Sequence, residues 1–178
     1  MIHPEAAVEI RYRPMQEADV EQVYNIDVLS FALPWSERSY RFEITENPTS
    51  RTWAAEAVDA HGQTRVVAMI VVWVILDEAH VATIAVHPDY RRRGIGQRLL
   101  ARALLDAAGH GVIQVYLEVR RGNLAAQAIY ERFGFSVTGV RSGYYRDNNE
   151  DALLMTLNPV RVEILQLFAG PLDNEPAV

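Results

Sequence analysis

The sequence contains no cysteine, which excludes disulfides, zinc–thiolate sites and a cysteine nucleophile. Because nothing indicates an oxidising compartment, we expect a cytoplasmic protein. The five histidines show no ligand spacing, so we expect no bound metal. The apolar run 66–76 has about half of the ~20 residues that a membrane span needs. Glu5 and Glu9 stand where a signal peptide would carry a basic start and an apolar run.

The sequence also has fewer basic than acidic residues. Lys and Arg number 17 against 23 Asp and Glu, a net charge of −6. This balance argues against general nucleic-acid binding and would suit a basic peptide partner. The 178 residues are 49% hydrophobic and 22% charged, which is typical of one globular domain with a core. We place this domain at 8–158 and expect 159–178 to be a partly disordered C-terminal extension.

Hydrophobic periodicity predicts strands and helices in the order β-α-α-β-β-β-α-β-α-β-β. The expected strands are 10–13, 52–58, 65–76, 79–86, 112–119, 135–145 and 151–157. The expected helices are 15–31, 36–46, 94–108 and 123–132, and a short apolar piece follows at 162–168. Interleaved helices and strands predict an α/β fold, a mixed sheet with helices on both of its faces.

The most informative stretch runs from Val86 to Leu100. A strand ends there in a Pro-Asp turn, three arginines follow, and Gly94 and Gly96 open an amphipathic helix. The free N–H groups and the dipole of a helix N-terminus bind phosphate oxygens, and glycine lets these oxygens approach the backbone. No Walker loop is present, and Leu99 stands where a dinucleotide fingerprint needs a small residue. The alternative is a basic turn before an exposed helix.

Polar side chains in the second half of the chain are candidates for chemistry. Glu118 lies in an apolar strand, where a carboxylate is costly unless it is paired, hydrated or used. The alternative for Glu118 is an ion pair with Arg120 or another arginine. Asn123 and Tyr130 are seven residues apart, on nearly the same side of a helix. Their alternatives are a plain N-cap and ordinary helix packing.

Two of these motifs resemble the same family. Arg91-x-x-Gly94-x-Gly96 after a strand resembles the acyl-coenzyme A pyrophosphate loop of the GCN5-related N-acetyltransferases (GNAT). The stretch 117–135, which holds the polar residues just described, resembles the closing half of that fold. The resemblance covers about 10–157 and implies the GNAT fold, with a mixed, mostly antiparallel seven-stranded sheet.

Two further stretches resemble one branch of the family. These are 33–37 (Leu-Pro-Trp-Ser-Glu) and 144–152, which begins with Tyr-Tyr and ends with Glu-Asp-Ala. They are similar to the branch that acetylates the N-terminal alanine of a small-subunit ribosomal protein. The resemblance therefore implies an acyltransferase whose acceptor is a protein N-terminus.

The resemblance implies acetyl-coenzyme A as cosubstrate. Main-chain groups of one strand would pair with the pantetheine arm, and amides of the loop would hold the pyrophosphate. The residues expected to bind the coenzyme are Ile84, Ala85, Val86, Arg91, Arg92, Arg93, Gly94, Ile95, Gly96, Gln97, Asn123 and Tyr130. The loop departs from the family pattern at His87, where acidic residues are common, and in the basic Arg91 and Arg93.

The resemblance also implies catalytic roles for Glu118 and Tyr130. An N-terminal ammonium has a pKa of about 7.7–8.0 and must lose a proton before it attacks. Glu118 would remove this proton directly or through water, and Tyr130 would protonate the departing thiolate. Main-chain N–H groups near Val86 would polarise the thioester carbonyl. Because the chain has no cysteine, we expect direct attack in a ternary complex.

The expected peptide groove is framed by Trp35, Tyr144 and Tyr145, for which packing at an exposed edge is the alternative. Two other functions stay open, because a shared fold does not decide the acceptor. One is a GNAT enzyme that acts on a small-molecule amine, and the other is a non-catalytic sensor of acyl-coenzyme A. Neither nucleic acid nor a membrane is an expected partner. The oligomeric state and the first residue of the acceptor are open.

Overall fold

The computed structural model describes residues 8–170. Its sheet has seven strands in the order β1-β2-β3-β4-β5-β7-β6. They are β1 (Glu9–Pro14), β2 (Ser50–Val58), β3 (Thr64–Ile75), β4 (Glu78–Val86), β5 (Gln114–Arg120), β6 (Ser136–Tyr145) and β7 (Glu150–Leu157). Within 8–170, β4 and β5 form the only parallel pair of neighbours. The expected mixed, mostly antiparallel seven-stranded sheet is confirmed.

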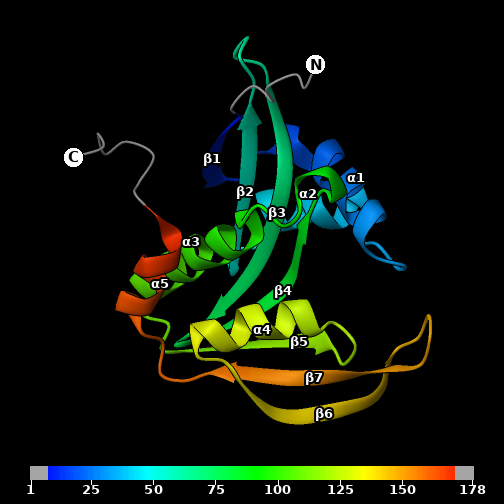
Figure 1. Ribbon diagram of the computed structural model, residues 1–178, viewed down its shortest axis with the longest axis vertical. Helices are drawn as coiled ribbons and strands as arrows, with labels where there is room; N and C mark the ends of the chain where they lie inside the picture. Colours follow the sequence, from blue (N-terminus) through cyan, green and yellow to red (C-terminus); the bar gives the residue numbers. More distant parts are fainter. Residues whose placement is uncertain (1–7, 171–178) are drawn as a thin grey trace, which may run out of the picture.

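Helices cover both faces of this sheet, as expected (Figure 1). They are α1 (Val20–Ser30), α2 (Glu37–Thr45), α3 (Ile95–Gly109), α4 (Leu124–Phe133) and α5 (Val162–Ala169), with short 3-10 turns at Glu17–Asp19 and Pro88–Tyr90. Val66, Met69 and Val71 of β3 pack with α1 and α2, whereas Val67 and Ile70 pack on the side of α3. A strand covered on both faces has an almost continuous apolar sequence. None of the helices described here is both long and apolar enough to cross a membrane.

The predicted helix over 15–31 is wrong at its start, because α1 begins at Val20. The carboxylate of Asp19 accepts the N–H of Gln16 at 2.7 Å and a hydrogen bond from Nη1 of Arg13, also at 2.7 Å. Such side-chain bonds to nearby backbone compete with helical hydrogen bonds. They accompany a 3-10 turn over Glu17–Asp19, and the helix starts only after it.

The apolar piece near the C-terminus forms α5, which packs along α3 (Figure 1). Leu165 is fully buried, and the ring of Phe168 stacks on Phe133 at 4.6 Å. Nε of Arg102 donates a hydrogen bond to the carbonyl of Ala169 at 3.2 Å. Part of the expected C-terminal extension therefore shares the core of the domain. The boundary at 158 stays a prediction, and so does the partial disorder expected over 159–178, of which 171–178 lie outside the described residues.

The strands β4 and β5 separate partway along their length (Figure 1). They pair over 78–81 and 114–117 and then diverge. Ala82 is a bulge, because Val81 and Thr83 on either side of it pair with successive residues of β3. A bulge bends a strand and increases its twist. The bulge therefore explains why the second half of β4 leaves β5 and presents a main-chain edge.

Candidate active site

A cavity of about 500 Å³ opens where β4 and β5 separate. Its walls come from α1 and the loop after it, from β4, β5 and α4, and from the end of β6. The expected site residues that line it are Trp35, Ile84, Glu118, Asn123, Tyr130, Tyr144 and Tyr145. The expected base, acid and acceptor-binding residues thus meet in one cavity. Ala85, Val86 and the loop 91–97 are not among its lining residues; they lie at the end of β4 and the start of α3.

The loop between β4 and α3 has the backbone shape of an anion site. Arg92 and Gly94 have positive φ angles of 61° and 75°. Gly94 precedes the first turn of α3 and offers no side-chain cap to its N–H groups. A Cβ at Gly96 would lie 3.0 Å from Cγ2 of Val86, so the end of β4 packs closely on this turn. The backbone N–H groups of the first turn of α3 have no side-chain cap and follow residues with a left-handed backbone conformation. Such N–H groups line a concave surface that fits a pyrophosphate.

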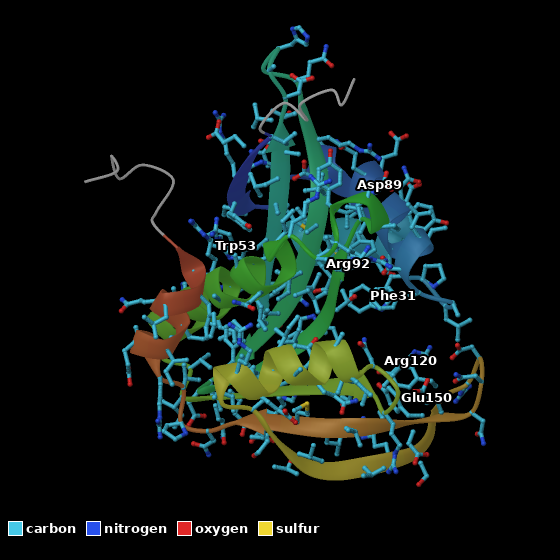
Figure 2. The ribbon with its side chains drawn as sticks, in the orientation of Figure 1. Phe31, Trp53, Asp89, Arg92, Arg120 and Glu150 are labelled. Carbon is cyan, nitrogen blue, oxygen red and sulfur yellow. The ribbon has the colours of Figure 1, made fainter. Side chains whose placement is uncertain are left out.

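The three arginines of this loop differ in their contacts. Nε of Arg91 donates to the carbonyl of Val86 at 2.9 Å, and its Nη2 donates to Oγ of Ser30 at 3.1 Å. This guanidinium therefore ties β4 to the end of α1. The main-chain N–H of Arg91 donates to the carbonyl of Pro88 at 3.3 Å. The guanidinium of Arg93 lies 5.3 Å from the ring centre of Tyr90. Arg92, labelled in Figure 2, is exposed.

Main-chain alternation decides which groups of β4 face the opening. His87 donates its N–H to the carbonyl of Val67 on β3 at 2.8 Å. Hydrogen-bonding groups alternate in direction along a strand, so those of Ala85 also point towards β3. The N–H and C=O of Ile84 and Val86 point to the side from which β5 has diverged. Both main-chain groups of Ile84 and the N–H of Val86 can therefore pair with an extended ligand, whereas the carbonyl of Val86 already accepts Nε of Arg91 and the main chain of Ala85 faces β3.

Glu118 has a charged partner as well as access to the cavity. Its side chain is 30% exposed, and its Oε1 lies 3.1 Å from Nη1 of Arg141 on β6. The ion pair left open by the sequence therefore forms, but with Arg141 and not with Arg120. Exposed ion pairs are worth only about 0–1 kcal/mol. This pair does not restrict the carboxylate to a structural role.

Arg120 instead fastens the turn between β6 and β7 (Figure 2). Its Nη1 donates to Oε2 of Glu150 at 3.1 Å and its Nη2 to Oδ1 of Asp147 at 2.8 Å. Its guanidinium lies 3.9 Å from the ring centre of Tyr145. The N–H of Gly122 donates to Glu150 at 2.7 Å, and this bond is the main reason why the pKa of Glu150 is lowered. These contacts hold Tyr145 at the cavity.

Tyr130 keeps its proton at neutral pH. It is 8% exposed, and burial, with a smaller effect of Tyr145, raises its pKa to about 12. Its hydroxyl is therefore a hydrogen-bond and proton donor at the cavity wall. On the same helix, Oδ1 of Asn123 accepts the N–H of Ala126 at 3.1 Å, the N-cap that was its alternative. Asn123 also lines the cavity, so capping and ligand binding are compatible.

The three aromatic residues expected at the acceptor groove combine packing with access to the cavity. The ring of Trp35 stacks on Trp73 at 6.2 Å. Tyr144 is 45% exposed and meets the ring of Tyr145 edge-on at 5.2 Å. Burial raises the pKa of Tyr145 to about 12, so its hydroxyl also stays a donor. A peptide would meet exposed rings and hydroxyl groups here.

Sequence reasoning misses two residues of this site. Asp27 lies on the buried stripe of α1 with Val20 and Val23, is 1% exposed and lines the cavity. The signal for Asp27 is a carboxylate at helical spacing within an apolar face. Arg141 reaches Glu118 from a strand that is not adjacent to β5. That contact depends on strand order, which the sequence pattern alone does not reveal.

The positive φ of Gly94, in the loop between β4 and α3, leads to a first prediction. Gly94→Ala is expected to lower the free energy of unfolding by about 1 kcal/mol, because its positive φ strains an L-residue. Nothing lies within 4 Å of the added Cβ, so strain and not a clash is the cause. Thermal melts should show a loss of about 2–4 °C. Gly94→Asn should lose less, since asparagine tolerates this conformation; an equal loss in both variants would contradict the explanation.

Comparison with known proteins agrees with this geometry. The sequence model of the acetyltransferase (GNAT) family matches residues 20–135. The ribosomal protein bS18-alanine N-acetyltransferase of Escherichia coli is 33% identical over 154 residues, 80% of this chain and 93% of that protein. An N-alpha-acetyltransferase, RimI, of Mycobacterium tuberculosis is 54% identical over 78 residues, 44% of this chain and 48% of that protein.

A solved structure supports the same assignment. The crystal structure of the ribosomal-protein-S18-alanine N-acetyltransferase from Escherichia coli matches with a TM-score of 0.75 and 32% identity. The match covers 85% of this chain and 94% of that chain. The resemblance in the sequence motifs is therefore confirmed, and so is acetyl-coenzyme A as the cosubstrate. The chain belongs to the GNAT family of acetyltransferases.

Proposed function

We propose that this protein transfers the acetyl group of acetyl-coenzyme A to the N-terminal amine of another protein, a small-subunit ribosomal protein that begins with alanine. One observation carries the proposal: a single cavity in which Glu118 and Tyr130 meet the aromatic wall of Trp35, Tyr144 and Tyr145. The relatives that are named ribosomal protein alanine N-acetyltransferases support this acceptor. The net charge of −6 suits a basic acceptor.

The chemistry follows from the two titratable groups at the cavity. The carboxylate of Glu118 accepts a proton from the acceptor ammonium, whose pKa is about 7.7–8.0, so that the nitrogen can attack. The new C–N bond replaces the C–S bond of the thioester, and the nitrogen releases its second proton to solvent as the amide forms, while Tyr130 regains a proton from solvent after the step. Tyr130, which is protonated at neutral pH, donates its proton to the departing sulfur. An acid or base placed in this way contributes about 10²–10⁴-fold to the rate.

The coenzyme is proposed to bind along the open edge of β4. The amides at the start of α3 would hold its pyrophosphate behind Gly94, and Ile84 and Val86 would pair with its arm. Asn123 would contact the arm from the start of α4. This arrangement directs the acyl end of the coenzyme along β4 towards the cavity that Glu118 lines.

An acceptor screen with acetyl-coenzyme A tests the proposal. Short peptides that begin with Ala, Ser, Met or Gly are compared with N-terminally blocked lysine peptides, polyamines, free amino acids and an aminoglycoside. We expect the alanine peptide to have a kcat/KM at least about tenfold above that of any lysine or small amine. A faster small amine would favour the small-molecule alternative. If none of the acceptors leads to release of coenzyme A, the non-catalytic sensor is favoured.

The acceptor wall gives a second prediction. Tyr144→Ala is expected to raise the peptide KM about threefold to tenfold, because a ring in an aromatic contact is worth about 0.5–1.5 kcal/mol. Tyr144→Phe should keep most of the affinity. Val140→Ala, an exposed position on the same strand that does not line the cavity, serves as the control. An unaltered KM in Tyr144→Ala would place this residue outside the groove.

We also propose a cytoplasmic location, which is the location expected from the sequence. A ribosomal acceptor would be modified in that compartment. Cell fractionation with a tagged full-length chain tests this proposal, and recovery outside the cytoplasmic fraction would contradict it.

A further inference from the structure

The chemistry proposed above makes no use of Asp27, a buried carboxylate at the cavity. Asp27 lies on α1, is 1% exposed and lines the cavity. Burial raises the pKa of this group, and a buried carboxylate is costly unless it forms compensating contacts. Asp19, at the start of the same helix, is compensated by the guanidinium of Arg13. Asp27 instead accepts a hydrogen bond from a backbone N–H.

Asp27 holds the backbone of the loop that follows α1. Its Oδ2 accepts the N–H of Trp35 at 2.6 Å. An N···O distance of 2.6 Å is at the short end of the range for N–H···O hydrogen bonds. One residue further on, the hydroxyl of Ser36 accepts the N–H of Ser39 and caps α2. The loop 31–36 is therefore fastened where it enters α2, by one bond to each of the two helices.

This loop forms one wall of the cavity. Phe31, Leu33 and Trp35 all line it, and Phe31 is labelled in Figure 2. Leu33 is 68% exposed, so packing alone does not hold the tip of the loop. The ring of Trp35 is 6.2 Å from Trp73 and 5.5 Å from the buried Tyr40. The bond to Asp27 fixes the backbone from which this ring and the exposed residues project.

We propose that Asp27 is a positioning residue for the acceptor: its bond to the N–H of Trp35 fixes loop 31–36, and thereby the wall against which the acceptor peptide lies. The inference rests on the proposed function, because it concerns the same acceptor. Asp27 acts through Trp35 and takes no part in moving protons. Its removal should therefore weaken acceptor binding much more than coenzyme binding.

Three variants of the full chain test this role: Asp27→Ala, Asp27→Asn and Asp19→Ala. Asp27→Ala is expected to raise the KM of an alanine peptide about tenfold, with the acetyl-coenzyme A KM within about twofold of the original. Asp27→Asn is expected to stay within about threefold of the original peptide KM, because its amide oxygen accepts the same N–H bond. Asp19→Ala removes a buried carboxylate that does not line the cavity, and its peptide KM should not change.

Circular dichroism in the aromatic region supplies a second readout that does not depend on activity. Trp35 and Trp73 are stacked, so their coupled signal should weaken in Asp27→Ala and persist in Asp27→Asn and Asp19→Ala. An unchanged peptide KM in Asp27→Ala would overturn the inference, and an unchanged signal would show that Asp27 does not hold the ring of Trp35. If Asp27→Ala does not fold, Asp27→Asn decides, because a raised peptide KM in that variant would show that the charge and not the bond matters.

The two proposals fail in different ways. If the unchanged protein acetylates no peptide N-terminus, the proposed function fails, while the spectral comparison still reports on the anchor between Asp27 and Trp35. If the unchanged protein acetylates the alanine peptide and Asp27→Ala does so with the same KM, only the role of Asp27 fails.

Discussion

Glu118→Gln is expected to lower kcat by about 10²–10⁴-fold while the affinity for acetyl-coenzyme A stays nearly the same. Glutamine has the shape of glutamate, so the cavity and the contact with Arg141 at 3.1 Å can persist. The amide, however, does not accept a proton from the acceptor ammonium. Steady-state kinetics with an alanine peptide and calorimetry with acetyl-coenzyme A measure the two quantities separately.

The pH dependence of this variant is also informative. The acceptor amine has a pKa of about 7.7–8.0, so above pH ~8 most of it arrives without the proton that Glu118 would remove. The residual rate of Glu118→Gln should therefore rise with pH through this range. Glu78→Gln, a partly exposed carboxylate on β4 that does not line the cavity, is the control and should keep its kcat. A normal kcat in Glu118→Gln would remove this residue from the mechanism.

Tyr130→Phe is expected to lower kcat by about 10²-fold with a much smaller change in coenzyme affinity. The ring still fills its place beside Phe135, 5.8 Å away, but the proton for the departing sulfur is lost. Burial raises the pKa of Tyr130 to about 12. Its hydroxyl therefore stays protonated up to about that pH, and the rate should show no basic limb from this group below pH ~11.

Tyr116→Phe is the matched control for this prediction. Tyr116 lies on β5 near Glu78 and does not line the cavity, so the loss of its hydroxyl should leave kcat unchanged. Equal kcat values in Tyr130→Phe and the unchanged protein would mean that water or another group protonates the sulfur.

Local patterns predict the order of the elements well, because each has its own period and end signals. Ser36 and Asn123 cap α2 and α4 as their sequence positions indicate. The predicted start of the first helix is wrong because the carboxylate of Asp19 accepts the backbone N–H of Gln16, which precedes the helix. The helix α5 needs α3 as a partner, since an apolar segment of eight residues gains its stability from packing.

The site residues that belong to a local sequence motif could be predicted. The features of the site that depend on tertiary contacts could not. Glu118, Asn123 and Tyr130 follow from one strand and one helix, and the structure places all three at one cavity. The bulge at Ala82, which opens that cavity, depends on the register between β3 and β4. The partner of Glu118 depends on strand order, which sequence periodicity does not report.

The most direct test of the account is the position of the acetyl group in a reaction product. A peptide that begins with alanine and carries an internal lysine is incubated with acetyl-coenzyme A and the protein, and tandem mass spectrometry locates the modification. We predict acetylation of the alanine α-amine, an unmodified lysine, and almost no product with Glu118→Gln. Acetylation of the lysine, or equal product with Glu118→Gln, would contradict the account.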